Sequence, residues 1–197
     1  MANINGSFGL RPIAKLGQGA NSTGNANYTM YEIANANSNA IYKGSPVIPL
    51  TTGYIDIVGA AGGTVSLAGV FMGCEYVAST TGKMTFSNYW PGSGADSNHP
   101  IKAYVEDDPM ALFVISTDAT WTSKATAIAD RFKNADFATA TSGTTATGLS
   151  SASVDISGAA ATKTLNLRIL GWVDDPSNAD FTAAGVGVIV RLNNHFN

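Results

Sequence analysis

The sequence predicts an all-β protein, a barrel or jelly-roll-like sandwich of many short antiparallel strands with an extended N-terminal arm and one short helix. Three observations support this prediction. Short segments alternate between apolar and polar residues, turn-forming Gly, Pro, Asn and Asp separate them, and a single segment has helical spacing. The length of 197 residues suits one such domain, or one domain with an arm.

The arm is expected at residues 1–27, which are rich in Gly, Asn and Ser and contain one apolar cluster at residues 8–13. A segment this polar cannot build a core of its own, so its apolar side chains should pack on the body or on a neighbouring subunit. A frayed terminus is the alternative. The candidate interface residues are Phe8, Leu10, Arg11, Pro12 and Ile13.

Residues 28–197 are expected to form a single β domain. Alternation with a period of two indicates half-buried strands at residues 28–33, 47–50, 54–58, 64–71, 75–79, 83–89, 101–105, 111–116, 149–156, 165–173 and 186–192. In segment 64–71, the side with Val65, Leu67 and Phe71 should face the core. This many short strands implies a barrel or sandwich.

Two segments depart from that alternation. Helical spacing of Ala125, Ile128, Ala129 and Phe132, after the plausible N-caps Thr122 and Ser123, predicts the short helix. Residues 137–164 are dominated by Ala, Thr, Ser and Gly, and their composition alone would fit a mobile linker. The apolar residues Leu149, Val154 and Ile156 indicate that part of this stretch is a strand.

Two acidic corners, Glu106-Asp107-Asp108-Pro109 and Asp174-Asp175-Pro176, follow predicted strands. Pro cannot donate to a sheet ladder, and Asp side chains accept hydrogen bonds from nearby amides in turns, so both corners should terminate strands. Their carboxylates could also bind calcium. The residues do not match the spaced acidic loop with its Gly that marks a strong calcium motif.

Composition argues against several functional classes. A net charge of -3 and a pI near 5.2 do not favour nucleic-acid binding. We expect neither a signal peptide nor a membrane span, because the apolar tracts are too short. Catalysis is not expected, since only His99 and His195 offer imidazoles and Cys74 reads as a small buried hydrophobe. Charged residues make up only 13%, and a neutral polar surface suits lasting contact with a partner.

The pair Tyr89-Trp90 is the best candidate for a recognition surface. Aromatic side chains at the end of a strand can stack against sugars or protein partners. The alternative is an aromatic plug at one end of the barrel.

Several stretches, taken in order, resemble a family of capsid decoration, or cement, proteins of tailed bacteriophages, common among marine phages. The likeness spans nearly the whole chain and is carried by residues 6–12, 40–47, 71–74, 104–109, 133–136, 147–150, 167–173 and 190–195. It implies an accessory subunit that binds the major capsid protein on the outer surface of the virion head, commonly as a homotrimer. It also implies no enzymatic activity and no cofactor.

An acidic protein fits the outside of the shell, because packaged DNA would repel it. The mechanical hypothesis is that the β body straddles subunit junctions while the arm clamps a neighbour, so that many modest contacts act together. Deleting residues 1–20 should then abolish head binding while the body stays folded. The alternative function is a glycan- or host-recognition module on the virion surface or tail that uses Tyr89 and Trp90.

Overall fold

The computed structural model describes residues 3, 6–17, 28–59 and 65–196, and it confirms an all-β fold with one short helix. No helix within these ranges is long and apolar enough to cross a membrane. The elements, in chain order, are β1 (Arg11–Lys15), β2 (Tyr28–Ile33), β3 (Ile41–Tyr42), β4 (Pro46–Pro49), β5 (Ile55–Ile57), β6 (Gly69–Val77), β7 (Met84–Ser87), β8 (Tyr89–Trp90), β9 (Ile101–Glu106), β10 (Ala111–Thr117), α1 (Lys124–Asp130), β11 (Asn134–Thr139), β12 (Gly143–Thr144), β13 (Leu149–Ser150), β14 (Ser153–Ala160), β15 (Leu167–Trp172), a 3-10 helix (Pro176–Asn178) and β16 (Gly187–Leu192).

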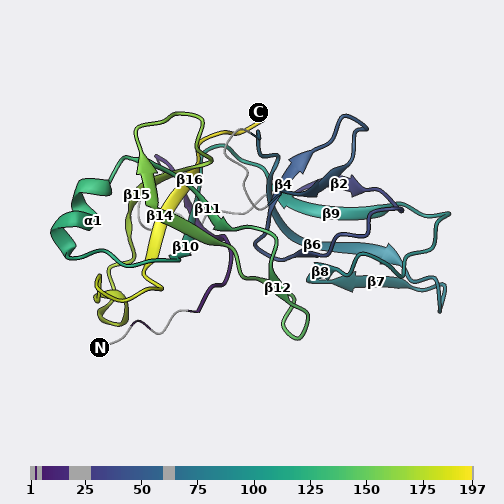
Figure 1. The fold of residues 1–197 in the computed structure, drawn as a ribbon. Coiled ribbons are helices and arrows are strands. Elements are labelled where there is room, and N and C mark those ends of the chain that lie inside the picture. Colours follow the sequence, from purple (N-terminus) through teal and green to yellow (C-terminus); the bar gives the residue numbers. More distant parts are fainter. Residues whose placement is uncertain (1–2, 4–5, 18–27, 60–64, 197) are drawn as a thin grey trace.

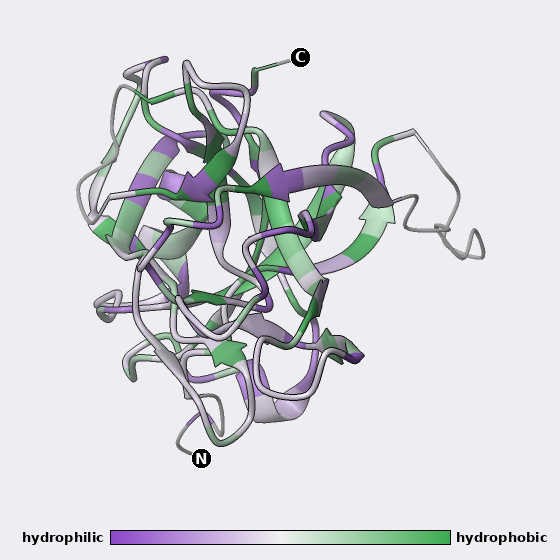
Figure 2. Cartoon of the chain, turned by 90° about the vertical axis from the view of Figure 1, so that its right-hand side faces the viewer, coloured by the Kyte–Doolittle hydropathy of each residue, from purple (hydrophilic) through white to green (hydrophobic). Residues whose placement is uncertain are grey.

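The first barrel is built from strands β2 to β9. Its order is β4-β5-β2-β9-β6, and β4 also pairs with β6, which closes the sheet. Strand β7 extends the sheet beyond β6. Buried and half-buried residues alternate along strands such as β5 and β9, so one side chain in two points inward. Figure 2 shows hydrophobic and hydrophilic segments distributed over the whole chain. The core contains Ile33, Ile41, Val47, Ile55, Phe71, Trp90, Ile101, Ala103 and Val105.

The second barrel is built from strands β10, β11, β14, β15 and β16, while β12 and β13 pair with each other in a separate two-stranded sheet. Its order is β10-β14-β11-β15-β16, and β16 pairs back onto β10. Strand β1 pairs antiparallel with the first half of β10 and so joins the N-terminal segment to this barrel. The core contains Leu10, Phe113, Ile115, Phe137, Val154, Leu167, Ile169, Val188 and Val190.

The two barrels lie side by side, with the corner after β9 leading from one into the other (Figure 1). Residues 67–71 run between them: Leu67 and Val70 pack into the second core, whereas Ala68 and Phe71 pack into the first. The expectation of a single core-facing side for this segment is therefore wrong, because a chain between two cores is covered on both faces. The assignment of residues 28–197 to one domain stays a prediction.

Two further expectations are corrected. The predicted strands at 64–71 and 75–79 are not separate, because β6 runs through both as one strand with an irregularity between Phe71 and Gly73. In α1, Ser123 is the N-cap and its hydroxyl accepts the amide of Thr126, as predicted. The helical spacing does not mark its buried side, however. Ala127 is the buried residue, whereas Ile128 and Phe132 are exposed.

Both acidic corners terminate strands as predicted. The carboxylate of Asp108 accepts the amide of Met110, and that of Asp175 accepts the amide of Ser177, each at 2.7 Å. The low-complexity stretch 137–164 is mostly strand, since β12, β13 and β14 lie within it. Close packing explains one glycine of this stretch, because a Cβ on Gly143 would overlap the ring of Tyr42.

Candidate interaction surface

The apolar cluster of the N-terminal segment is docked on the chain's own body. Leu10 is 1% exposed in the core of the second barrel, and its amide donates to the carbonyl of Gly44 at 2.9 Å. Gly9 has φ +72°, and a Cβ there would lie 2.7 Å from both the Gly44 carbonyl oxygen and the Ser150 Cβ. Glycine is therefore required for this approach.

The remaining candidate residues divide between contact and exposure. Phe8 is half-buried beneath the guanidinium of Arg11, which lies 4.2 Å from the ring centroid. Pro12 is half-buried in β1, and Ile13 is 46% exposed. The proposed clamp on a neighbouring subunit uses the apolar side chains of this segment. Leu10 is too buried to contact a neighbour, whereas Ile13 is exposed enough to do so.

The pair Tyr89-Trp90 packs inward. Trp90 is 1% exposed in the first core and meets Tyr76 edge to face, with ring centroids 5.3 Å apart. Tyr89 stacks on Tyr42 with centroids 5.5 Å apart. The aromatic plug is the alternative that fits Trp90, because a buried ring cannot stack on a sugar. A recognition role for Tyr89 stays a prediction.

An exposed apolar surface lies instead on the outside of the first barrel, on strands β2, β9, β6 and β7. Met30 is 61% exposed, Met84 54% and Phe86 71%. Cross-strand register connects them: Met30 lies opposite Tyr104, Tyr104 opposite Gly73, Glu75 opposite Phe86, and Val77 opposite Met84. We call Met30, Met84, Phe86 and Tyr104 the outer apolar face.

Two opposite charges at the centre of this face pair with each other. Lys102 Nζ lies 3.1 Å from one oxygen of Glu75, and the Tyr104 hydroxyl donates to the other at 2.8 Å. The hydrogen bond from Tyr104, followed by that from Lys102, lowers the pKa of Glu75, so this carboxylate is ionised at neutral pH. The result is an apolar surface with an internally paired centre, which is less costly to desolvate than free charges.

A shallow hollow opens at the irregularity in β6. Its volume is about 310 Å³, and Phe86 and Tyr104 flank it together with Met72. Gly73 forms part of its lining, and a Cβ there would lie 3.1 Å from the carbonyl oxygen of Ser87. Hollows bordered by exposed aromatic and Met side chains suit insertion of an apolar group from a partner.

This face could not be predicted from the sequence for a physical reason. Met84 and Phe86 alternate with polar residues, and that pattern is the same whether the apolar side faces a core or solvent. No sequence signal distinguishes the two cases, because the position of β7 outside the closed part of the sheet is a property of the fold.

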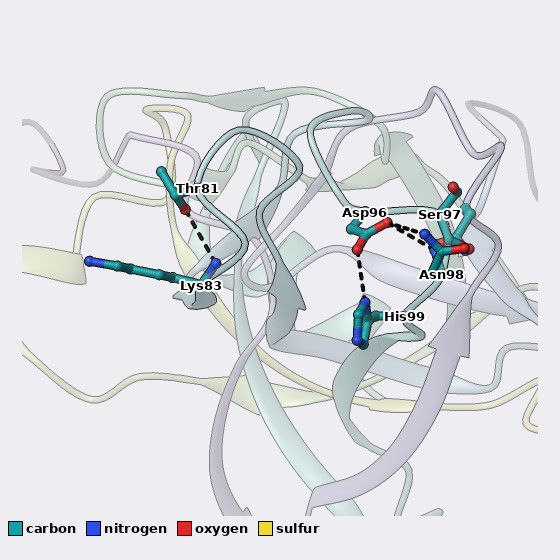
Figure 3. Close-up of polar contacts among 7 residues, drawn as sticks. Thr81, Lys83, Asp96, Ser97, Asn98 and His99 are labelled. Atoms are coloured by element: carbon teal, nitrogen blue, oxygen red, sulfur yellow. Dashed lines mark hydrogen bonds and ion pairs between the residues drawn. The ribbon is translucent and has the colours of Figure 1, made fainter.

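The far end of the first barrel is polar. The carboxylate of Asp96 accepts the amide and the side chain of Asn98, each at 3.0 Å, and lies 2.9 Å from Nδ1 of His99 (Figure 3). The Asn98 amide and then His99 lower the pKa of Asp96. These contacts stabilise a loop, and they leave the imidazole of His99 about half exposed.

The remaining reactive groups are occupied or buried. Burial raises the pKa of the Cys74 thiol to about 12, so it is protonated at neutral pH. Burial lowers the pKa of His195, which is half-buried. Asp107 accepts hydroxyls of Thr29 and Tyr31, and Asp108 pairs with Lys15 at 2.6 Å. Within the described ranges no group of three His, Cys, Asp or Glu could hold a metal ion.

Comparison with known proteins does not place the chain in a family. No protein-family model matches it, and no curated protein sequence matches it significantly.

Proposed function

We propose that this chain is a structural virion protein that binds the outer surface of a tailed-phage head and stabilises the capsid lattice, without enzymatic activity. The observation that carries the proposal is the outer apolar face. Met30 on β2 and Met84 and Phe86 on β7 stand exposed on the same side of the first sheet, with β9 and β6 between them. Such a surface marks a protein-binding site.

The physical properties of the whole chain agree with a lattice partner. Its charged fraction of 13% leaves a neutral polar surface around the apolar face, and the resemblance noted in the sequence implies the major capsid protein as the partner. Two barrels side by side present two separate outer faces, which suits a subunit that straddles a junction. Many such contacts on one shell act together even when each is modest.

The experiment is the binding of purified protein to isolated heads that lack it, measured by co-sedimentation over a concentration series. The double variant Met84→Ser, Phe86→Ser should weaken binding at least tenfold, because it removes the most exposed apolar groups of the face. Phe132→Ser is the matched control, since Phe132 is 67% exposed but lies beyond α1 on the other barrel. Equal binding by the double variant and the control would contradict the assignment of this face.

A further inference from the structure

All four arginines of the chain belong to the second barrel or to the segments attached to it, although the chain as a whole is acidic. Arg11 lies on β1, Arg168 on β15 and Arg191 on β16, and Arg131 follows α1 directly. The strands β15, β16, β10 and β1 are neighbours in that order. Their outward side chains therefore share one face.

Register places the arginines around an apolar centre. In one row, Arg168 lies directly opposite Arg191, which lies opposite Leu112. In the other row, Gly171 lies opposite Ile189, Ile189 opposite Val114, and Val114 opposite Arg11. The flanking residues Leu167, Ile169, Val190 and Leu192 point into the core, so Arg11, Arg168, Arg191 and the central residues Leu112, Val114 and Ile189 point outward. Arg131 joins them from the end of α1, since its Nη2 lies 4.0 Å from the place of a Cβ on Gly171. We call these seven residues the arginine face.

None of these guanidinium groups contacts a carboxylate in the part of the chain that the structure describes, where every ion pair uses Lys or His instead. Arg131 lies over the ring of Trp172, 4.6 Å from its centroid, and Arg11 lies over Phe8. Arg168 donates through Nε to the side-chain oxygen of Asn134 at 3.1 Å. Arg191 Nε is buried, and no acceptor for it lies among the described residues.

This arrangement is unfavourable in the isolated chain. Like charges directly opposite on neighbouring strands repel one another, as Arg168 and Arg191 must. A buried donor of a charged group without an acceptor carries a desolvation cost as well. Carboxylates from outside would remove the repulsion, because each guanidinium presents a planar fork that matches a carboxylate.

The centre of the face indicates what kind of molecule carries those carboxylates. Leu112, Val114 and Ile189 are each half-buried, so they present apolar surface between the arginines. An apolar centre with arginines at its margin is the composition of a protein–protein interface. A nucleic acid would need several further cations, whereas this chain has a net charge of -3 and places Asp175 in the hollow beside Arg11.

We infer that the arginine face binds an acidic protein surface whose carboxylates pair with Arg168 and Arg191 and whose apolar side chains cover Leu112, Val114 and Ile189. The inference rests on the proposed function, because the head lattice then supplies that surface. The first barrel contributes the outer apolar face to one subunit, and the second barrel contributes the arginine face to a neighbouring subunit.

The test uses the full chain and isolated heads that lack it. The Gln variant, Arg168→Gln with Arg191→Gln, removes both opposed charges. The Lys variant, Arg168→Lys with Arg191→Lys, keeps the charges but removes the planar guanidinium groups. The control is Lys83→Gln, Lys124→Gln, which removes two exposed charges elsewhere. Thermal melting checks each fold, and the Gln variant should melt no lower than the parent because the repulsion is gone.

The Gln variant should bind heads at least tenfold more weakly than the parent. The Lys variant should bind more weakly than the parent but more tightly than the Gln variant, and the control should bind like the parent. Raising the salt concentration from 50 to 500 mM should weaken the parent more than the Gln variant. Parental binding by the Gln variant would overturn the inference and leave the proposed function standing. Absence of binding by the parent chain itself would overturn both.

A second measurement distinguishes a protein partner from a nucleic acid. A labelled 20-base-pair DNA duplex is titrated with the parent chain and followed by fluorescence anisotropy. We expect no binding at physiological salt. Binding of the duplex that is lost in the Gln variant would overturn the inference, because the arginines would then serve phosphates.

Discussion

Glu106 is an acidic side chain held where its charge is poorly compensated. It is 1% exposed, and neither carboxylate oxygen has a hydrogen-bond partner of good geometry among the described residues. Burial raises the pKa of Glu106, and Lys15 and the Asp108 amide offset this only in part. A raised carboxyl pKa means that the stability contributed by the protonated form is fully present below the ordinary value of 4.5 and is lost as pH rises through the folded value.

The variant Glu106→Gln should therefore raise the free energy of unfolding at pH 7, by about 1 kcal/mol, since it removes the poorly compensated charge. The gain should disappear below pH 4.5, where the parent side chain is also neutral. Urea unfolding at several pH values measures both. An equal gain at pH 7 and pH 4 would show that the charge is not its cause.

The neighbouring Asp108 should behave in the opposite sense. Its ion pair with Lys15, followed by the amide of Met110, lowers the pKa of Asp108. The stability it contributes is present above the ordinary value of 3.8 and is lost as pH falls through the lower folded value. The variant Asp108→Asn should be less stable than the parent at pH 7. The two should converge at pH 2, and persistence of the full difference at pH 2 would contradict the ion pair as its origin.

At the scale of elements, β1 and the residues before it belong to the second barrel energetically. Leu10→Ala should lower the free energy of unfolding by about 3 kcal/mol, because it leaves a cavity in a packed core. Ile13→Ala should change it by less than about 0.5 kcal/mol, since that side chain is largely exposed. Chemical denaturation followed by Trp fluorescence distinguishes them. A similar loss of unfolding free energy for the two variants would mean that β1 is not held to the second barrel through Leu10.

The same packing revises the expected effect of removing residues 1–20. Loss of Leu10 and of the β1–β10 pairing should destabilise the second barrel, so a truncated chain would not be a clean test of a clamp. Residues 18–20 lie outside the described residues. Single substitutions on the exposed side, such as Ile13→Ser, test the clamp without damage to the core.

Most strands could be predicted from the sequence, because alternation over residues such as 101–105 and 186–192 directly reflects one buried side. Their division into two closed sheets could not. Strand pairing depends on contacts far apart in the chain, and the double burial of residues 67–71 appears only once both cores are present. Helical spacing in 125–132 predicted a helix correctly but not its buried side, since the short α1 packs through Ala127 alone.

At the scale of the whole molecule, the two barrels separate two kinds of surface. The first carries exposed Met and Phe around the paired Glu75 and Lys102. The second carries arginines that pair with no carboxylate among the residues that the structure describes. The sequence could suggest an assembly protein from its low charge. It could not locate either surface, because each is built from strands that are distant in the chain and adjacent only in the folded sheet.

The two-surface arrangement predicts how combined variants behave. If both faces bind the lattice at once, loss of either face should weaken binding strongly, because the avidity of linked contacts is lost. Loss of both faces should reduce binding to background. The double variants Met84→Ser, Phe86→Ser and Arg168→Gln, Arg191→Gln are tested separately and combined in one chain. Co-sedimentation with heads measures the binding of each. Strong residual binding by the combined variant would mean that a third surface holds the protein.

The central claim is that this chain is a component of the head lattice. The most direct measurement is its copy number relative to the major capsid subunit in purified virions, by quantitative mass spectrometry. The account predicts a near-stoichiometric ratio. A handful of copies per virion would contradict it and favour a tail or recognition role, and absence from virions would contradict any structural role there.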